Sequence, residues 1–299
     1  MATHLDPVAW KKKKKIIITV SVIVGALLII GLTSWLLLRN WLKPTIRYAK
    51  AEKALSAGNT EEAIEIFKSL GTYRDANDRA AELAFSAQKD DALERMLKSA
   101  KVGDIVTFGR YEQDNNLQNG PEPIRWLVLA ERDGRLLLWS VDVLDHAQYS
   151  SDLKNTTWEN CTLRTWLNDT FYQSAFTGEE RLLIPITEWK NTDNSASGAT
   201  GGKDTEDRVS ILSFDELLEY GIDNPGIETI AAYPSAYAVA QGVERHDWYG
   251  TCKWWMRTPG IDQTNAVYCD MVGQPLYTAP VNRYGNGVRP LVWVVIGNR

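Results

Sequence analysis

Aromatic and basic side chains that could bind a ligand are concentrated near the C-terminal end of the sequence. Four of them could form a binding floor in which a guanidinium group stacks on an indole ring. The alternative is a structural role, in which the arginines donate hydrogen bonds to loop carbonyls and hold the core together. We favour this structural role for Trp255, Arg257 and Arg289, and we keep Trp254 as a candidate for ligand binding.

Two turn-rich segments, residues 246–249 and 282–284, supply the other candidates for a ligand-binding surface. Recognition residues are frequently carried on loops that a rigid scaffold positions. A flat ring on such a loop would stack on a sugar or on a peptide side chain, although the same ring could simply cover the edge of a core. The candidates in these segments are Trp248, Tyr249, Asn282, Arg283 and Tyr284.

Metal binding and catalysis find little support in the sequence. The chain has three cysteines and three histidines, and they form no pattern of paired zinc ligands. No serine, histidine and acid arrangement follows from the spacing either. We therefore predict a non-catalytic protein with no metal site and no other cofactor.

The cysteines allow at most one internal disulfide. Cys252 and Cys269 flank neighbouring predicted strands, so a bridge between them is our hypothesis for a domain that lies outside the cytoplasm. Cys161 would then be a single buried thiol. Gly198–Lys203 reads GATGGK, which is one residue short of a phosphate-binding loop and predicts a mobile loop.

Short strand patterns separated by turns begin after Lys101 and must position these residues. Asp133-Gly134 predicts a hairpin between IRWLVLA and RLLLWSV. Helical spacing follows in CTLRTWLNDTFYQSAF, a capped helix is predicted at Ser213–Glu216, and SAYAVAQG predicts a third short helix. Strand patterns return in KWWMRT, AVYCDMV and GVRPLVWVVI, so we predict an α+β domain over residues 101–299.

The N-terminal region predicts a membrane anchor. Residues 16–40 contain an uncharged apolar run, which predicts a transmembrane helix that binds the lipid bilayer. Residues 1–15 carry five consecutive lysines, which favour a basic cytoplasmic tail. A cleaved signal peptide is the alternative, but the apolar run is longer than a typical signal core. The prediction is a single-pass plasma-membrane protein with an extracytoplasmic C-terminal domain.

A helical spacer is predicted between these regions, over residues 43–100. Small and apolar residues recur there at helical spacing, and Gly58-Asn59 separates two helices. The stretch YAKAEKALSAGNTEEAIEIFKSLGTY resembles a tetratricopeptide-type helical hairpin. Such units usually need several neighbours, so we expect a short α-helical hairpin that acts mainly as a spacer.

The C-terminal segments also resemble a known family. LRTWLNDTFYQSAF, ERLLI, DRVSILSFDEL, YAVAQG, WWMRTPG and GVRPLVWV occur in this order. Together they resemble an uncharacterised bacterial domain family with a C-type lectin-like fold, which is distantly similar to formylglycine-generating, sulfatase-modifying enzymes. The resemblance implies this fold over residues 101–299. It does not bring the chemistry, because the copper-binding cysteine pair and the calcium-binding segments of those relatives are incomplete here.

These observations together predict a membrane-anchored cell-surface binding or adaptor protein. Its C-type lectin-like domain would recognise a glycan, a peptide or a protein without catalysis. The alternatives are an enzyme of the sulfatase-modifying type and a structural envelope component. Nucleic acid is not expected as a partner, because the net charge is -5 even with the N-terminal lysines included.

Overall fold

The computed structural model describes residues 21, 24–36, 42–221, 227 and 229–296. The chain divides into two compact units, Met1–Ala92 and Leu93–Arg299. The C-terminal unit thus begins inside the segment that the sequence suggested as a spacer, and Leu97 and Ala100 of that segment are buried in the C-terminal core.

The predicted transmembrane helix is contradicted. No helix among the described residues combines the length and apolar character that crossing a membrane requires. The single-pass topology and the plasma-membrane location are therefore withdrawn. The remainder of residues 16–40, apart from residue 21, and the basic tail 1–15 lie outside the described residues.

The N-terminal unit contains a small helical core. Helices α2 and α3 are joined by a turn at Gly58, whose φ of 81° suits a residue without a side chain. The ring of Tyr48 packs edge-on against Phe67 at 5.2 Å, and its hydroxyl donates to Asp75 at 2.6 Å. Its helices are α2 (Lys43–Ser56), α3 (Thr60–Leu70) and the part of α4 (Ala76–Ser99) up to Ala92. The tetratricopeptide-like role of this region stays a prediction.

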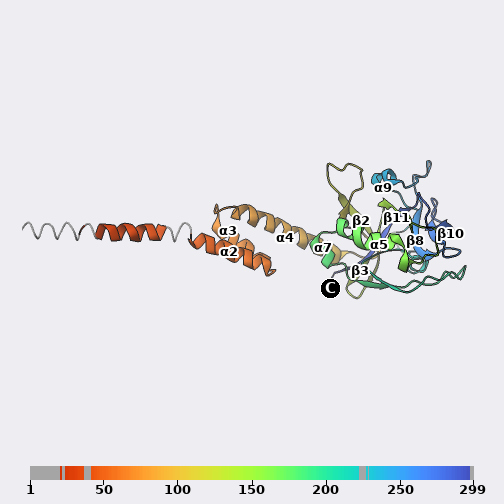
Figure 1. The fold of residues 1–299 in the computed structure, drawn as a ribbon, viewed down its shortest axis with the longest axis horizontal. Helices are drawn as coiled ribbons and strands as arrows, with labels where there is room; N and C mark the ends of the chain where they lie inside the picture. The colour runs from red at the N-terminus through yellow and green to blue at the C-terminus, as the bar shows by residue number, and fades with distance from the viewer. Residues whose placement is uncertain (1–20, 22–23, 37–41, 222–226, 228, 297–299) are drawn as a thin grey trace, which may run out of the picture. The chain divides into compact units, whose positions relative to one another are not determined.

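The C-terminal unit mixes short helices with antiparallel sheet, which confirms the α+β class (Figure 1). Of the strands described, five form a sheet in the order β1-β2-β3-β12-β7 and five form a second sheet in the order β10-β9-β8-β11-β4. A small pair, β5-β6, stands apart from both. The strands are β1 (Ile105–Tyr111), β2 (Glu122–Arg132), β3 (Arg135–Ser140), β4 (Asp145–His146), β5 (Thr187–Trp189), β6 (Thr205–Asp207), β7 (Val209–Ile211), β8 (Trp254–Pro259), β9 (Asn265–Cys269), β10 (Pro275–Pro280), β11 (Gly287–Val288) and β12 (Pro290–Val295).

The helical segments of this unit are short and well capped. Thr177 and Ser213 each accept a side-chain hydrogen bond from the amide of the third residue of the helix that follows, which is a glutamate, and each cap's own backbone amide donates to the carboxylate of that glutamate. The capped helix predicted at Ser213 is thereby confirmed. The segments are η2 (Trp158–Asn160), α5 (Thr162–Trp166), the π-helical turn η3 (Leu167–Phe171), α6 (Tyr172–Ala175), α7 (Gly178–Leu182), α8 (Phe214–Glu216), the π-helical turn η4 (Leu217–Gly221) and α9 (Ala236–Gln241).

The β2–β3 hairpin shows why the central strands are apolar throughout. Asp133 and Gly134 have φ values of 52° and 69°, as the predicted tight turn requires. Leu136 and Leu138 point into one hydrophobic core, whereas Leu137 and Trp139 belong to a second core on the other face. Because both faces of this sheet are covered, successive side chains are all apolar.

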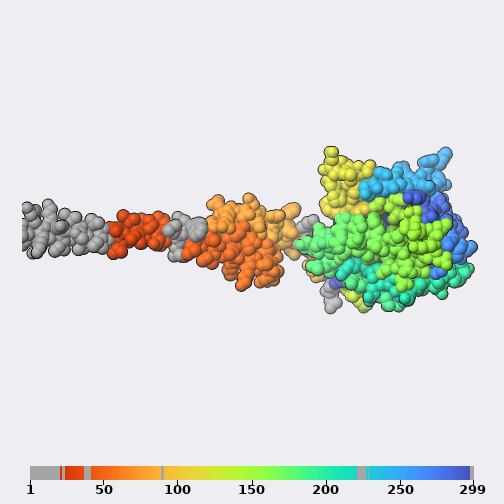
Figure 2. All heavy atoms as spheres, in the orientation of Figure 1, coloured from red at the N-terminus to blue at the C-terminus, as the bar shows by residue number. Residues whose placement is uncertain are grey.

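The loop between β1 and β2 protrudes from the surface beside α9 (Figures 1 and 2). The backbone amide of Tyr237 on α9 donates to the carbonyl of Gln113 in this loop at 3.0 Å. Three carboxylates of the loop, Glu112, Asp114 and Glu122, lie within 4.8 Å of one another. They accept hydrogen bonds from amides of the same loop, so their geometry is that of a folded turn.

Candidate functional site

The C-terminal unit contains a cavity of about 510 Å³ on the face of the first sheet that carries Leu137. Four separate segments enclose it: the β2–β3 hairpin, β5, β12 and the α8–η4 segment. A volume in this range suits a small-molecule ligand. We call it the aromatic cavity, after three of its lining residues, Trp189, Tyr220 and Trp293.

The aromatic rings come from three different elements. Trp293 lies on β12 and is half-buried, so part of its indole faces the cavity. Trp189 ends β5 and is almost completely buried, and its indole nitrogen donates to the carbonyl of Asp207 at 3.2 Å. Tyr220 follows in η4, where burial raises the pKa of its hydroxyl to about 12 and keeps it protonated at neutral pH. These rings give the cavity apolar walls with fixed orientations.

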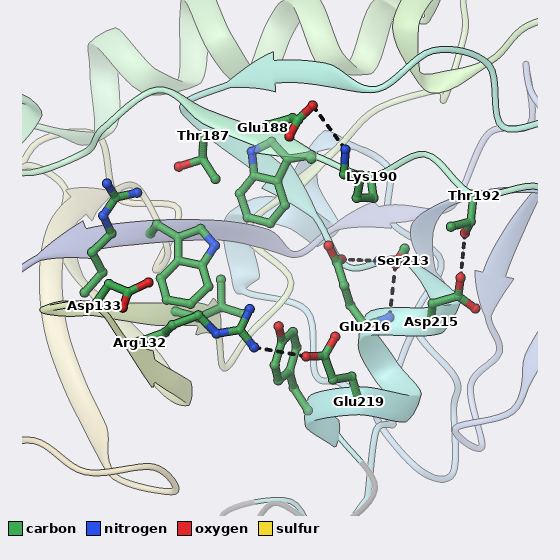
Figure 3. Close-up of a pocket in the computed structure, with 15 residues that line it drawn as sticks. Arg132, Asp133, Thr187, Glu188, Lys190, Thr192, Ser213, Asp215, Glu216 and Glu219 are labelled. Atoms are coloured by element: carbon green, nitrogen blue, oxygen red, sulfur yellow. Dashed lines mark hydrogen bonds and ion pairs between the residues drawn. The ribbon is translucent and has the colours of Figure 1, made fainter.

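Charged side chains of both signs surround these rings (Figure 3). Arg132 pairs with Glu219 at 3.2 Å, and Lys190 pairs with Glu188 at 3.1 Å. Figure 3 places these two pairs on opposite sides of the cavity. All four side chains are exposed, and such pairs contribute only about 0–1 kcal/mol each. A bound ligand could therefore replace one member of either ion pair with little loss of free energy.

A buried ion pair holds one wall of the cavity. The side chain of Arg257 is 1% exposed, and its Nη2 lies 2.7 Å from Oε1 of Glu216. The same guanidinium donates from Nε to Oδ1 of Asn191 at 2.9 Å and lies 5.4 Å from the centre of the Trp189 ring. Arg257 thus connects β8 to the end of β5 and to α8, and the contacts it makes are those of a structural residue.

The candidates from residues 246–249 and 282–284 lie outside the aromatic cavity. Trp248 is 91% exposed, and Tyr249 and Tyr284 are also exposed. The start of the first segment lies near the end of the second, since the amide of Glu244 donates to the carbonyl of Gly285 at 3.0 Å. Their exposed rings therefore lie on the surface, outside the aromatic cavity.

Asn282 and Arg283 are only half-exposed and take part in local packing. The carbonyl of Asn282 accepts a hydrogen bond from the side chain of Gln148. The guanidinium of Arg283 lies 5.9 Å from the centre of the Tyr268 ring. Both residues therefore contribute to the support of this loop.

Trp254 does not reach the surface, so the structure removes it from the binding candidates. Its exposure is 0%, and its indole nitrogen donates to the carbonyl of Ile230 at 3.3 Å. The whole of β8 is buried, because Trp254 points into one core and Trp255 into the other. Trp255 donates from its indole nitrogen to the carbonyl of Ala147 at 2.8 Å.

The three cysteines are free and buried in the structure. The bridge suggested between Cys252 and Cys269 is therefore not formed. Burial raises the pKa of each thiol to about 12, including that of Cys161. A thiol with such a pKa is protonated at neutral pH and is a poor nucleophile.

His146 supports the 282–284 segment and gives it a pH dependence. Its ring stacks on Tyr284 at 5.4 Å, and its Nε2 accepts a hydrogen bond from the amide of Gly285 at 3.3 Å. Burial lowers the pKa of His146, although the neighbouring carboxyl of Asp145 acts in the opposite direction. The folded state therefore favours the neutral imidazole, while the unfolded chain takes up a proton near pH 6.5.

We expect His146 to lower the free energy of unfolding when the pH is made acidic. The pKa of His146 is lower in the folded state than in the unfolded chain, so its titration leaves the free energy of unfolding unchanged above about pH 6.5. Below that pH the unfolded chain takes up a proton first, and the free energy of unfolding decreases until the pH reaches the folded pKa, by at most about 1.4 kcal/mol per pH unit. Denaturant unfolding at pH 7.5 and 5.5 should show a smaller decrease for His146→Gln than for the unmodified chain. Burial raises the pKa of Asp145, so its titration increases the free energy of unfolding as the pH falls, and it does so in both proteins. Equal decreases would contradict this assignment.

Comparison with known families adds one finding. The model of a family described as a domain of unknown function, DUF6273, matches residues 133–296. No curated protein and no solved structure matches the chain. The matched region contains every residue of the aromatic cavity except Arg132.

Proposed function

We propose that this chain, which belongs to the DUF6273 family, is a non-catalytic binding protein whose aromatic cavity holds a short neutral glycan. The observation that carries the proposal is the combination of three aromatic rings with a rim that carries charges of both signs, among them the pairs Arg132–Glu219 and Lys190–Glu188. The lectin-like fold is part of this proposal.

The aromatic rings favour a ligand with a flat apolar face. A sugar ring presents a face of C–H groups that can stack on an indole or a phenol, and Trp293 and Tyr220 offer such surfaces. Pockets of this kind usually combine aromatic walls with a few polar groups that set orientation. The aromatic cavity has this composition.

The rim charges favour a ligand without net charge. Arg132 and Lys190 already face carboxylates, so an anionic ligand would meet Glu219 and Glu188 as like charges. A cationic ligand would meet the arginine and the lysine in the same way. Sugar hydroxyls both donate and accept, so they can bond to either member of a pair.

The sulfatase-modifying alternative receives less support. That chemistry would need a reactive thiol, and the thiols here are buried with pKa values raised to about 12. Neither Cys252 nor Cys269 lines the aromatic cavity.

Glycan and peptide arrays probed with the full chain would test the proposal. We expect binding to neutral glycans, and a decrease of about tenfold or more on Trp293→Ala, because a central aromatic contact typically contributes over 1 kcal/mol. Trp248→Ala is the matched control, since Trp248 is an exposed indole outside the cavity. Loss of binding with Trp248→Ala but not with Trp293→Ala would move the site to residues 246–249. Binding to peptides alone would overturn the glycan assignment.

A further inference from the structure

A second cavity, of about 230 Å³, lies on the same face of the first sheet. Leu137 lines the aromatic cavity and Trp139, two positions along β3, lines this one. Arg289 also lines it, and we call it the Arg289 cavity. A space of this size corresponds to roughly seven or eight water molecules, at about 30 Å³ each.

Among the described residues, Arg289 is a buried cation whose hydrogen-bond acceptors are neutral carbonyls, while the carboxylate of Asp142 favours its charged form from beyond 4.0 Å. It is 5% exposed, its Nε donates to the carbonyl of Ser140 at 3.0 Å, and its Nη1 donates to that of Ile230 at 3.3 Å. The guanidinium carbon lies 3.3 Å from the centre of the Trp139 ring. Within the part of the chain that the structure describes, no carboxylate oxygen comes within 4.0 Å of this guanidinium.

An unpaired buried charge is costly, and the surroundings of Arg289 reflect that cost. Burial lowers the pKa of this arginine to about 9. Carbonyl dipoles and an indole face compensate a buried guanidinium only in part, whereas a carboxylate would do so with two parallel hydrogen bonds. The indole N–H of Trp139 is likewise buried without an acceptor among the described residues.

The rest of the Arg289 cavity defines the ligand further. Arg125 and Asp142 line it as an ion pair at 2.6 Å, so together they add no net charge. The remaining surface is mainly apolar and includes Leu127, Val141 and Ala231. Among its described lining residues, the cavity therefore carries one more positive than negative charge, beside an apolar space.

We infer that the Arg289 cavity binds a small monocarboxylate with an apolar body, whose carboxylate pairs with Arg289 while its hydrocarbon part contacts Leu127 and Val141. This site is separate from the aromatic cavity and does not depend on glycan binding.

Calorimetric titration of the full chain with benzoate would test this inference. We expect benzoate to bind, and both benzyl alcohol, which has a similar apolar body without charge, and inorganic phosphate, which has charge without an apolar body, to bind about tenfold more weakly or less. Equal binding of benzyl alcohol would remove Arg289 from recognition. Equal binding of phosphate would show that the apolar contacts do not contribute to recognition. The absence of benzoate binding would overturn the inference.

Two variants place the site. Arg289→Met removes the charge, and Ala231→Leu fills the cavity while leaving Arg289 in place; each should weaken benzoate binding about tenfold or more. Ala231 is half-buried at the cavity wall, so Ala231→Leu provides the test if Arg289→Met does not fold. Trp248→Ala, outside the cavity, should bind benzoate as the unmodified chain does. Unchanged binding by Ala231→Leu would place benzoate elsewhere.

Discussion

Replacing Arg257 with alanine should lower the free energy of unfolding by about 3–5 kcal/mol, the range for breaking one partner of a buried ion pair. The substitution leaves the carboxylate of Glu216 in a largely buried position, 16% exposed, without its cation. It also removes donors from the carbonyls of Ile211 and Lys190, which Arg257 contacts at 2.6 and 3.1 Å. Urea unfolding of the purified chain would measure the change.

A matched control separates the ion pair from the general effect of losing an arginine. Arg110 is exposed, and Arg110→Ala should change stability by no more than about 0.5 kcal/mol. Glu216→Gln, alone and combined with Arg257→Ala, completes a cycle in which the coupling of the two residues should reach about 0.5–3 kcal/mol. A coupling near zero would show that Arg257 acts through its carbonyl contacts alone.

Local signals in the sequence predicted local structure well. Asp133-Gly134 specifies its turn through two residues that accept positive φ, and Ser213 with Glu216 specifies a helix start through reciprocal hydrogen bonds. Both patterns act within four residues, so no distant contact can easily override them. The strands and helices around them followed from the same kind of evidence.

The site could not be predicted in the same way, because its residues are far apart in the sequence. Trp189, Tyr220 and Trp293 meet only after β5, η4 and β12 are placed around one face of a sheet. The sequence instead suggested Trp254 as a ligand-binding candidate, but β8 is covered on both faces and buries it. One available signal was Trp293, an amphipathic ring within an otherwise aliphatic strand, LVWVV.

The membrane prediction failed for a different reason. Hydropathy measures the length of an apolar run in sequence, and residues 16–40 pass that test. Among the described residues, no helix is both long and apolar enough to span a membrane.

The GATGGK segment shows how a motif can mislead about its role. A Cβ added to Gly201 would lie 2.3 Å from the carbonyl oxygen of Asn191 and 2.4 Å from that of Thr192. Both are backbone atoms, and Asn191 is itself fixed by Arg257. Gly201 therefore allows a close approach of two chain segments beside the aromatic cavity, which Thr192 lines.

Gly201→Ala should consequently destabilise the fold by about 3 kcal/mol, the upper part of the usual range for overpacking, because neither segment can move freely. It should also weaken glycan binding, since displacing Thr192 breaks its 2.6 Å hydrogen bond to Asp215 on the cavity rim. Gly178→Ala is the control: nothing lies within 4 Å of the added carbon, and alanine is the better helix former there, so stability should stay equal or rise by up to about 1 kcal/mol. Thermal unfolding of both variants would measure these changes. Equal unfolding midpoints for Gly201→Ala and Gly178→Ala would mean that residues 191 and 201 do not approach as closely as this packing requires.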